Sequence, residues 1–442
     1  MSIPHAERAG EGELMKNRTY VKQLRNIAAR GSIIVFFIMA FEVMIMISPF
    51  AFFFYSVFNP VLHWLERYSA TRWLTSFFLP HMILPPTLFL QAIRILGSVL
   101  FVVGALTFTI CALQVYLGKI FKWGIADKGL YRIIRHPQYL ALGLWGIGMS
   151  ILWSRFLVLA SLSLMFILYY FLAKDEERRM LNQFGEGYRH YMERTGMFMP
   201  RQVEALLSAP LGRVPNPALK YVAIALGIPV VVIGSGFLLR VITLSSLPIQ
   251  TSRNVTLVSI LPEDESLNQK VLAELFPGPD AHPNLSFFKA NKDYLGYVMP
   301  VDYVMQGMIA DTGGEFHLHQ HHNTFALIAD WVLNPFEHLR RSPSAQMAAM
   351  HNVDPAMARR HHCPLSINDP ALQCEACPFR RIVFVEIDHG DKGHLSGEKL
   401  FSFNAVRVPV CFIDLNVQTG EVVNMKRVEK TTAWRDVPTP AI

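Results

Sequence analysis

Long apolar runs, separated by basic segments, constrain this chain more than any other feature. Ser32 to Phe58 contains a single charged residue and exceeds the roughly 20 residues that a helix needs to cross a bilayer. Ile95 to Leu117 is a second such run, and Lys220 to Ile242 is a third. A helix can cross a membrane because it satisfies its own backbone hydrogen bonds. The sequence therefore predicts a polytopic α-helical membrane domain.

The apolar run from Leu140 to Leu172 is too long for one crossing. Trp153-Ser154-Arg155 near its middle predicts the turn of a two-helix hairpin, which brings the expected number of spans to about five. Phe77 to Leu90 is also apolar but contains three prolines. Because proline removes backbone donors and disrupts helices, we expect this segment to be interfacial or re-entrant.

Charge is distributed unevenly about residue 245. Residues 1–245 hold 24 Lys and Arg against 12 Asp and Glu, whereas residues 246–442 hold 17 against 22. The basic residues of the first part cluster in residues 1–31 and in the loops after the second and fourth predicted spans. With five spans these segments share one side, which the enrichment of cytoplasmic loops in Lys and Arg identifies as the cytoplasm. We expect a basic cytoplasmic N-terminal segment at 1–31, a membrane domain at 32–245 and an extracytoplasmic domain at 246–442.

Composition and context exclude other classes of protein. The chain is 52% hydrophobic and 17% charged, and ordinary soluble domains are about a quarter charged, which disfavours a single soluble domain. A cleaved signal peptide does not fit, because a polar and basic segment precedes the first apolar run and no cleavage site follows it. Basic residues confined to loops between spans do not favour nucleic-acid binding. We expect an integral protein of the inner or plasma membrane whose first partner is the lipid bilayer.

The two loops that flank the predicted hairpin contain the most specific motifs. Residues 129–139 read GLYRIIRHPQY and lead into the third span, and residues 175–191 read DEERRMLNQFGEGYRHY and follow the fourth. A hairpin returns the chain to the side that it left, so His136 and Glu177 can meet at one membrane face. The sequence thus predicts a polar pocket at this face.

Residue types in these loops indicate what the pocket could bind. Pro137 is suited to the first turn of the third span, and Arg135 and His136 then lie beside a helix N-terminus, where an anionic group such as a carboxylate is favoured. Glu176 and Glu177 suit an amino group or a sulfonium. The alternative is that the arginines only anchor the span to lipid headgroups and that the glutamates only begin a solvated helix.

The RHPxY element, the paired glutamates and the FGxxYxxY element occur together in an order that resembles isoprenylcysteine carboxyl methyltransferases and their relatives, including membrane phospholipid methyltransferases. The resemblance covers roughly residues 95 to 201. It implies an S-adenosylmethionine-dependent methyltransferase, and it implies that the cofactor is bound by Tyr131, Arg135, His136, Pro137, Tyr139, Glu176, Glu177, Tyr188 and Tyr191.

Two positions depart from the family pattern. Leu130 stands where the family commonly has proline, and Thr195-Gly196-Met197 stands where it has a basic or aliphatic motif. Both departures bear on the class of methyl acceptor, which we expect to be lipophilic or a small thiol, carboxylate or amine. Methyl transfer to such a nucleophile depends mainly on positioning and exclusion of water, so the sequence identifies no catalytic base. The alternative is a membrane-anchored metal or redox protein whose methyltransferase-like core is a scaffold.

Beyond Pro248 the sequence predicts a soluble α+β domain. Strands are expected at residues 254–261, 382–387, 405–415 and 421–428, with a hairpin turn at 418–420 and a helix at Glu265–Leu275. The whole chain is therefore predicted as a polytopic α-helical membrane domain followed by an α+β domain.

This second domain contains a histidine cluster and a cysteine cluster. His317, His319 and His321 share one face if extended, with His322 on the other, and such histidines suit Zn or Cu. The alternative is a solvated loop. Cys363, Cys374 and Cys377, with Cys411 as a further sulfur, are compatible with a metal site, a redox dithiol or a structural disulfide. Haem attachment is disfavoured because no histidine follows the CxxC.

Overall fold

The computed structural model describes most of the chain between residues 61 and 428. The described residues are 31, 37, 61–121, 127–212, 215–276, 285, 287–301, 303, 306–307, 309–310, 332–340, 379–388, 394–428 and 441–442. They fall into two compact units. The first comprises residues 1–41, 100–150 and 158–234, and the second comprises residues 42–99, 151–157 and 235–442.

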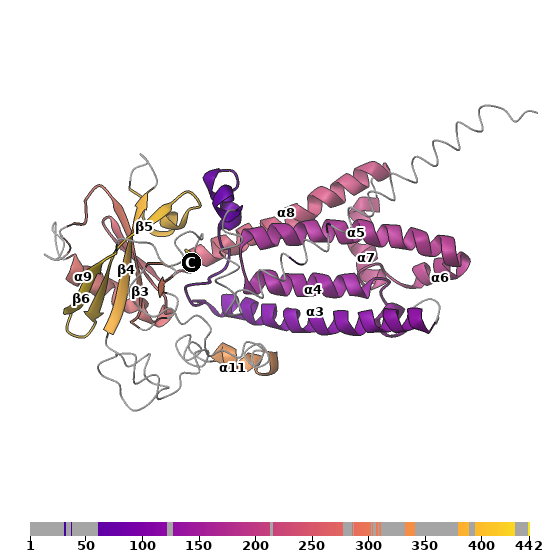
Figure 1. The fold of residues 1–442 in the computed structure, drawn as a ribbon, viewed down its shortest axis with the longest axis horizontal. Coiled ribbons are helices and arrows are strands. Elements are labelled where there is room, and N and C mark those ends of the chain that lie inside the picture. Colours follow the sequence, from indigo (N-terminus) through magenta and orange to yellow (C-terminus); the bar gives the residue numbers. More distant parts are fainter. Residues whose placement is uncertain are drawn as a thin grey trace, which may run out of the picture. The chain divides into compact units, whose positions relative to one another are not determined.

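Helices make up the N-terminal half (Figure 1). They are α3 (Leu88–Ile120), α4 (Pro137–Leu152), α5 (Phe156–Phe184), α6 (Glu186–Arg194), α7 (Arg201–Gly212) and α8 (Pro217–Ser245). α4 and α5 are joined by Trp153–Arg155, which confirms the predicted hairpin and its turn. The helix expected at Ile95–Leu117 lies within α3, and the one expected at Lys220–Ile242 lies within α8.

Three of the described helices are long and apolar enough to cross a membrane, namely Leu88–Val115, Phe156–Phe184 and Ala218–Ser245. α4 has only 16 residues, and the run from Ser32 to Phe58 lies almost wholly outside the described residues. The predicted helical part is therefore confirmed to contain helices capable of crossing a membrane, whereas the count of five spans and the sidedness stay predictions.

Glycines allow the helices of the first unit to pack closely. A Cβ on Gly104 of α3 would overlap the backbone of Trp145 and come within 2.9 Å of the Ala141 carbonyl oxygen in α4. A Cβ on Gly143 of α4 would lie 2.9 Å from the ring of Phe166 in α5. Small residues at such contacts are typical of membrane helices, where close van der Waals packing drives association. α4 of the hairpin thus packs closely against both α3 and α5.

The second unit is built on a six-stranded sheet in the order β1-β2-β3-β4-β5-β6 (Figure 1). Its strands are β1 (Ile249–Ser252), β2 (Val255–Ser259), β3 (Asp293–Pro300), β4 (Phe379–Asp388), β5 (Val406–Asn416) and β6 (Val422–Arg427). β2 and β3 are parallel, with α9 (Glu265–Leu275) between them in the chain, and the other neighbours are antiparallel. A short helix, α11 (Pro335–Arg340), lies between β3 and β4 in sequence.

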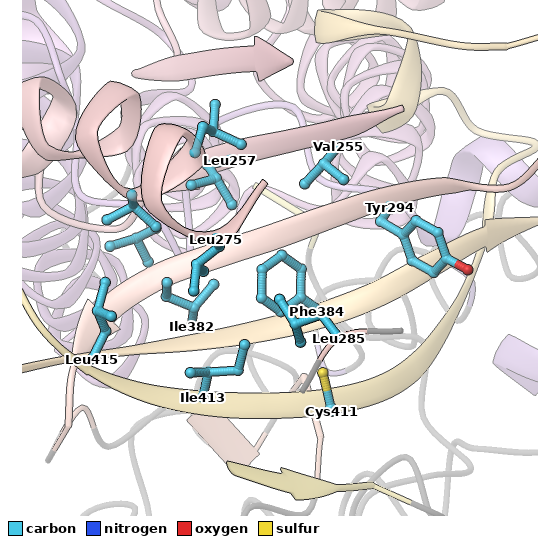
Figure 2. Packing of buried hydrophobic residues seen from close by; sticks show 13 residues of the cluster. Val255, Leu257, Leu275, Leu285, Tyr294, Ile382, Phe384, Cys411, Ile413 and Leu415 are labelled. Atoms are coloured by element: carbon cyan, nitrogen blue, oxygen red, sulfur yellow. The ribbon is translucent and has the colours of Figure 1, made fainter. Parts of the chain in front are cut away.

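One face of this sheet packs against α9 and forms a hydrophobic core (Figure 2). Leu257 of β2, Ile382 and Phe384 of β4 and Ile413 of β5 project into this core and are fully buried. Cys411 projects from β5 into the same core and is a free, buried thiol. The sequence analysis gave Cys411 as a further sulfur for a metal or disulfide site, and its place among apolar side chains argues against that role.

The proline-containing segment before α3 is hydrogen-bonded to residues of the second unit. Main-chain N–H groups of His81 and Met82 both donate to the carbonyl of the C-terminal residue, Ile442, and Leu84 N–H donates to Ile260. Tyr297 of β3 donates its hydroxyl to the Ala441 carbonyl over 3.0 Å. Residues 78–87 contain no helix, as their prolines predicted, and Leu88 begins α3.

The second unit also holds the last three turns of α8. The Arg240 guanidinium is buried, donates to the carbonyls of Phe77 and Phe401, and lies 4.5 Å from the ring of Phe403. Thr243 donates to the Phe78 carbonyl over 3.2 Å. The sheet, the residue 77–86 segment and this end of α8 therefore form one hydrogen-bonded body.

Candidate functional site

The RHPxY motif lies where the chain turns into α4. Pro137 is the first residue of α4, as predicted, and the His136 carbonyl accepts from the N–H groups of Tyr139 and Leu140 over 3.1 and 3.2 Å. A proline in the first turn costs no intrahelical hydrogen bond, because that N–H has no partner there anyway. His136 is thus fixed at the helix entry, with Arg135 immediately before it.

A second segment runs alongside these two residues and fixes their backbone. α5 ends at Phe184, and Gly185, with a positive φ of 53°, turns the chain into α6. After α6, Thr195–Met197 returns to the motif: Arg135 N–H donates to the Gly196 carbonyl over 2.8 Å and His136 N–H to the Met197 carbonyl over 3.0 Å. Residues 129–137 and 195–197 therefore form one wall.

Arg135 and Glu177 form a buried ion pair at the centre of this region. Arg135 Nε donates to Glu177 Oε1 over 2.6 Å, and both side chains are buried. Lys174 Nζ lies 3.2 Å from the other carboxylate oxygen, Glu177 Oε2. The rest of the Arg135 guanidinium donates to the carbonyls of Met192 and Thr195. Glu177 is thus joined to two cations, and Arg135 ties α5 to the end of α6.

His136 lies between the paired glutamates. Its Nδ1 is 3.6 Å from Glu176 Oε2, and its Nε2 is 3.7 Å from Glu177 Oε1. Burial of the ring lowers the His136 pKa, but the two carboxylates outweigh burial and raise this pKa above its ordinary value of 6.5. Nε2 is buried and has no hydrogen-bond partner among the described residues. The imidazolium form is therefore favoured, with an N–H directed into the cluster.

The two glutamates differ in access to solvent. Glu177 is buried, whereas the side chain of Glu176 is 44% exposed. The Tyr139 hydroxyl donates to Glu176 Oε2 over 3.4 Å. Glu177 therefore holds the site together, and Glu176 presents a carboxylate at its open side.

Aromatic rings adjoin the charged cluster. The Tyr139 ring stacks on His136 with centroids 5.7 Å apart and on Tyr169 of α5 at 5.1 Å, and Phe198 lies 6.1 Å from His136. The motif predicted Tyr139. Tyr169 and Phe198 were not predicted, because a single aromatic residue in an apolar run or beside a loop gives no sequence signal of its own.

The remaining predicted tyrosines form an adjoining buried group. Tyr191 donates its hydroxyl to the Tyr131 carbonyl over 2.6 Å, Tyr131 donates to the Cys111 carbonyl over 3.5 Å, and Tyr188 lies 5.6 Å from Tyr191. Burial raises the pKa of Tyr191 to about 12, so its hydroxyl stays protonated and donates. These three tyrosines stabilise the loops around the cluster. Within the described part of the chain, none of them donates a hydrogen bond to Glu176.

The structure adds two features that the sequence analysis missed. Lys174 lies one helical turn before Glu177, an i, i+3 spacing that predicts a contact once the carboxylate is known to be buried. Thr195-Gly196-Met197 was noted only as a departure from the family pattern, yet it forms the wall beside His136. A Cβ on Gly196 would overlap the Met199 carbonyl oxygen and lie 2.7 Å from Glu204 Oε2, so glycine is required.

The predicted metal cluster is not addressed by the described structure. Its residues, His317, His319, His321, His322, Cys363, Cys374 and Cys377, lie outside the described residues. Within the described part of the chain, no group of three or more His, Cys, Asp or Glu side chains is placed to hold a metal ion. The expectation of Zn or Cu therefore receives no support.

The charged cluster coincides with a region of known family. Residues 87–187 match the family model of phospholipid methyltransferases. Over these residues the chain is similar to that family. The matched range contains α3, the α4–α5 hairpin and every charged residue of the cluster, and it ends before Tyr188 and the 195–197 wall. It covers less than a quarter of the 442 residues and does not reach the sheet of the second unit.

Two further comparisons give no relative. No curated protein and no solved structure matches the chain significantly. The chain thus has a methyltransferase-like membrane core, identified from one family.

Proposed function

We propose that this protein is an integral-membrane methyltransferase that uses S-adenosylmethionine and methylates a lipophilic or small nucleophile reached from the bilayer. The observation behind the proposal is that the family match coincides with a cluster in which Arg135, His136 and Glu177 are buried and Glu176 is exposed at the open side. A scaffold would need none of these charges buried, and burying charge is costly unless it is paired.

The cluster suits a ligand that carries both signs of charge. The amino-acid end of S-adenosylmethionine has a carboxylate and an ammonium. Its carboxylate would be held by His136, whose buried Nε2 has no hydrogen bond among the described residues, and its ammonium by the exposed Glu176. Such a ligand exchanges one ion pair for another, so that no buried charge is left unpaired.

The other residues of the site would orient the ligand. Tyr139 and Phe198 lie beside His136, and Tyr169 stacks on Tyr139; these rings would provide a surface for stacking of the adenine. Bound cofactor supplies an electrophilic methyl group on a sulfonium. Because that group needs no acid catalyst, the protein contributes positioning, charge and exclusion of water, and we assign no catalytic base.

Cofactor binding tests this proposal. Full-length protein reconstituted in lipid nanodiscs should bind labelled S-adenosylmethionine, and Glu176→Gln and His136→Ala should each weaken binding about tenfold, as expected for losing a charged hydrogen bond worth roughly 1.5 kcal/mol. Glu186→Gln is the control, because Glu186 is 74% exposed and pairs only with Arg189 on the surface of α6.

The outcomes separate the two functional classes. Binding by the parent and by Glu186→Gln, with loss in the two site variants, supports the proposal. Failure of the folded parent protein to bind S-adenosylmethionine would contradict it and would favour the scaffold alternative.

A further inference from the structure

Helix α7 has its apolar face turned away from the rest of its unit. Val203, Leu206 and Leu207 follow the i, i+3, i+4 spacing of a single helix face, and all three are exposed, with Leu206 75% exposed. A helix on a water-soluble protein turns such a face inward, because burying it is the main source of its stability. None of the described residues buries this face, and an exposed apolar face of this kind suits contact with an apolar medium or partner.

The polar side of α7 is the side that contacts the chain. Glu204 accepts a hydrogen bond from the Met197 N–H, and the Arg201 guanidinium donates to the Glu193 carbonyl. Arg201 and Glu204 lie on the opposite side of the helix from Leu206 at 100° per residue. The orientation of α7 is therefore fixed by specific hydrogen bonds and is the reverse of that of an ordinary surface helix.

The chain that follows α7 identifies the lipid bilayer as its partner. Residues 213–216 link it to α8, and four extended residues reach at most roughly 14 Å. α8 contains the apolar stretch Ala218–Ser245, which is long enough to cross a membrane and most of whose side chains are not buried within the protein. The C-terminal end of α7 thus lies close to the N-terminal end of a helix that can cross a membrane.

The start of α8 is also apolar and exposed. Leu219, Tyr221 and Val222 are exposed in its first turns. Tyrosine is enriched where spans meet the membrane interface. Amphipathic helices that lie in the interface bury their apolar face at the boundary of headgroups and acyl chains.

We propose that α7 is an in-plane helix that docks on the lipid bilayer through Val203, Leu206 and Leu207. A second copy of the chain is the competing occupant, and the experiment below distinguishes the two. The docking does not depend on the proposed methyltransferase function.

Hydrogen bonds through Met197 connect α7 to the candidate site. Met197 donates its N–H to Glu204 of α7, and its carbonyl accepts from the His136 N–H. The position of α7 on the membrane therefore fixes the wall beside His136. This second consequence rests on the proposed function, whereas lipid contact does not.

Photo-crosslinking tests the docking. Benzoylphenylalanine replaces Leu206 in one full-length variant and Ser208 in another, and each is reconstituted in vesicles of phosphatidylcholine containing a labelled phospholipid. Ser208 is exposed but lies on the opposite side of α7, so it is the matched control. We expect a labelled lipid adduct at position 206 and none at position 208.

Other results overturn the proposal. A crosslink from position 206 to a second copy of the chain would assign the face to a dimer. Equal lipid adducts at both positions, or no adduct at 206, would show that α7 is not docked by this face. Benzoylphenylalanine at Leu207 repeats the test at a second position, and gel filtration confirms that each variant is folded. Because the readout is lipid contact, failure of the methyltransferase proposal leaves it unaffected.

Discussion

Removal of the buried charge of Glu177 should destabilise the protein strongly. In the Glu177→Gln variant, Arg135 loses a 2.6 Å charged hydrogen bond, Lys174 loses its partner at 3.2 Å, and His136 loses one of its two carboxylates. Because Arg135 is buried, its charge is left uncompensated in a poorly solvated place. Breaking a buried pair in this way costs about 3–5 kcal/mol.

The double variant Arg135→Gln with Glu177→Gln separates a specific pair from general damage. Removing both charges leaves no buried arginine without its carboxylate, so the double variant should be much more stable than the sum of the two single losses predicts. It should not return fully to the parent, because the carbonyls of Met192 and Thr195 also lose their donor. We expect a coupling free energy of about 2 kcal/mol or more.

Thermal unfolding in a mild detergent measures these effects. About 3–5 kcal/mol corresponds to a fall in Tm of roughly 6–20 °C for a domain of this order of size. Glu186→Gln, on the exposed face of α6, should change the free energy of unfolding by no more than about 0.5 kcal/mol and leave Tm nearly unchanged. Strictly additive losses in the double variant, or a Glu177→Gln variant as stable as Glu186→Gln, would refute the assignment of Glu177 as the buried anchor of the site.

Three further predictions follow from single residues. Because the pKa of His136 is raised, its contribution to stability and to binding of a carboxylate is complete below pH 6.5 and is lost as the pH rises through the raised pKa. Binding of S-adenosylmethionine should therefore weaken over this pH range, and His136→Gln should abolish this pH dependence. A pH profile that is the same in His136→Gln as in the parent would contradict the prediction. Gly196→Ala should lower the free energy of unfolding by about 1–3 kcal/mol, because the added Cβ would overlap the Met199 carbonyl oxygen. Gly187→Ala is the control and should be neutral or slightly stabilising, because a Cβ there meets nothing within 4 Å. Equal effects of the two substitutions would rule out the close approach of the Met199 carbonyl to Gly196. Cys411, buried and with a pKa raised to about 12 by burial, should resist thiol alkylation in the folded protein, as peptide mapping would show, and fast labelling would contradict its place in the core.

The sequence predicted those elements whose pattern is local. The helix at Glu265–Leu275 has the predicted bounds, and the α4–α5 turn lies where a polar tripeptide interrupts a long apolar run. β3 was missed because all eight of its residues are buried, so the alternation that marks a half-exposed strand is absent. Gly296 within it looks like a strand breaker, but a Cβ there would meet Leu257 and Phe384 at 2.5 and 2.8 Å.

The candidate site was predicted as a meeting of two loops but not as a set of contacts. The motifs predicted that Arg135, His136, Glu176 and Glu177 would meet, and the structure brings all four side chains together. Which charge pairs with which depends on burial, and burial depends on the wall at Thr195–Met197, whose backbone hydrogen bonds leave no mark in side-chain identity. The expectation that Arg135 would be available to a carboxylate is therefore modified, because Glu177 already occupies it.

Transfer of a labelled methyl group tests the central claim most directly. Full-length protein in nanodiscs is incubated with methyl-labelled S-adenosylmethionine and a total membrane lipid extract, to which small thiols and amines are added in parallel, and label is followed into the organic phase and into the added acceptors. The account predicts label in an acceptor with the parent and with Glu186→Gln, and its loss with Glu176→Gln and His136→Ala. Cofactor that neither binds nor donates its methyl group to any of these acceptors, with folded protein, would contradict it.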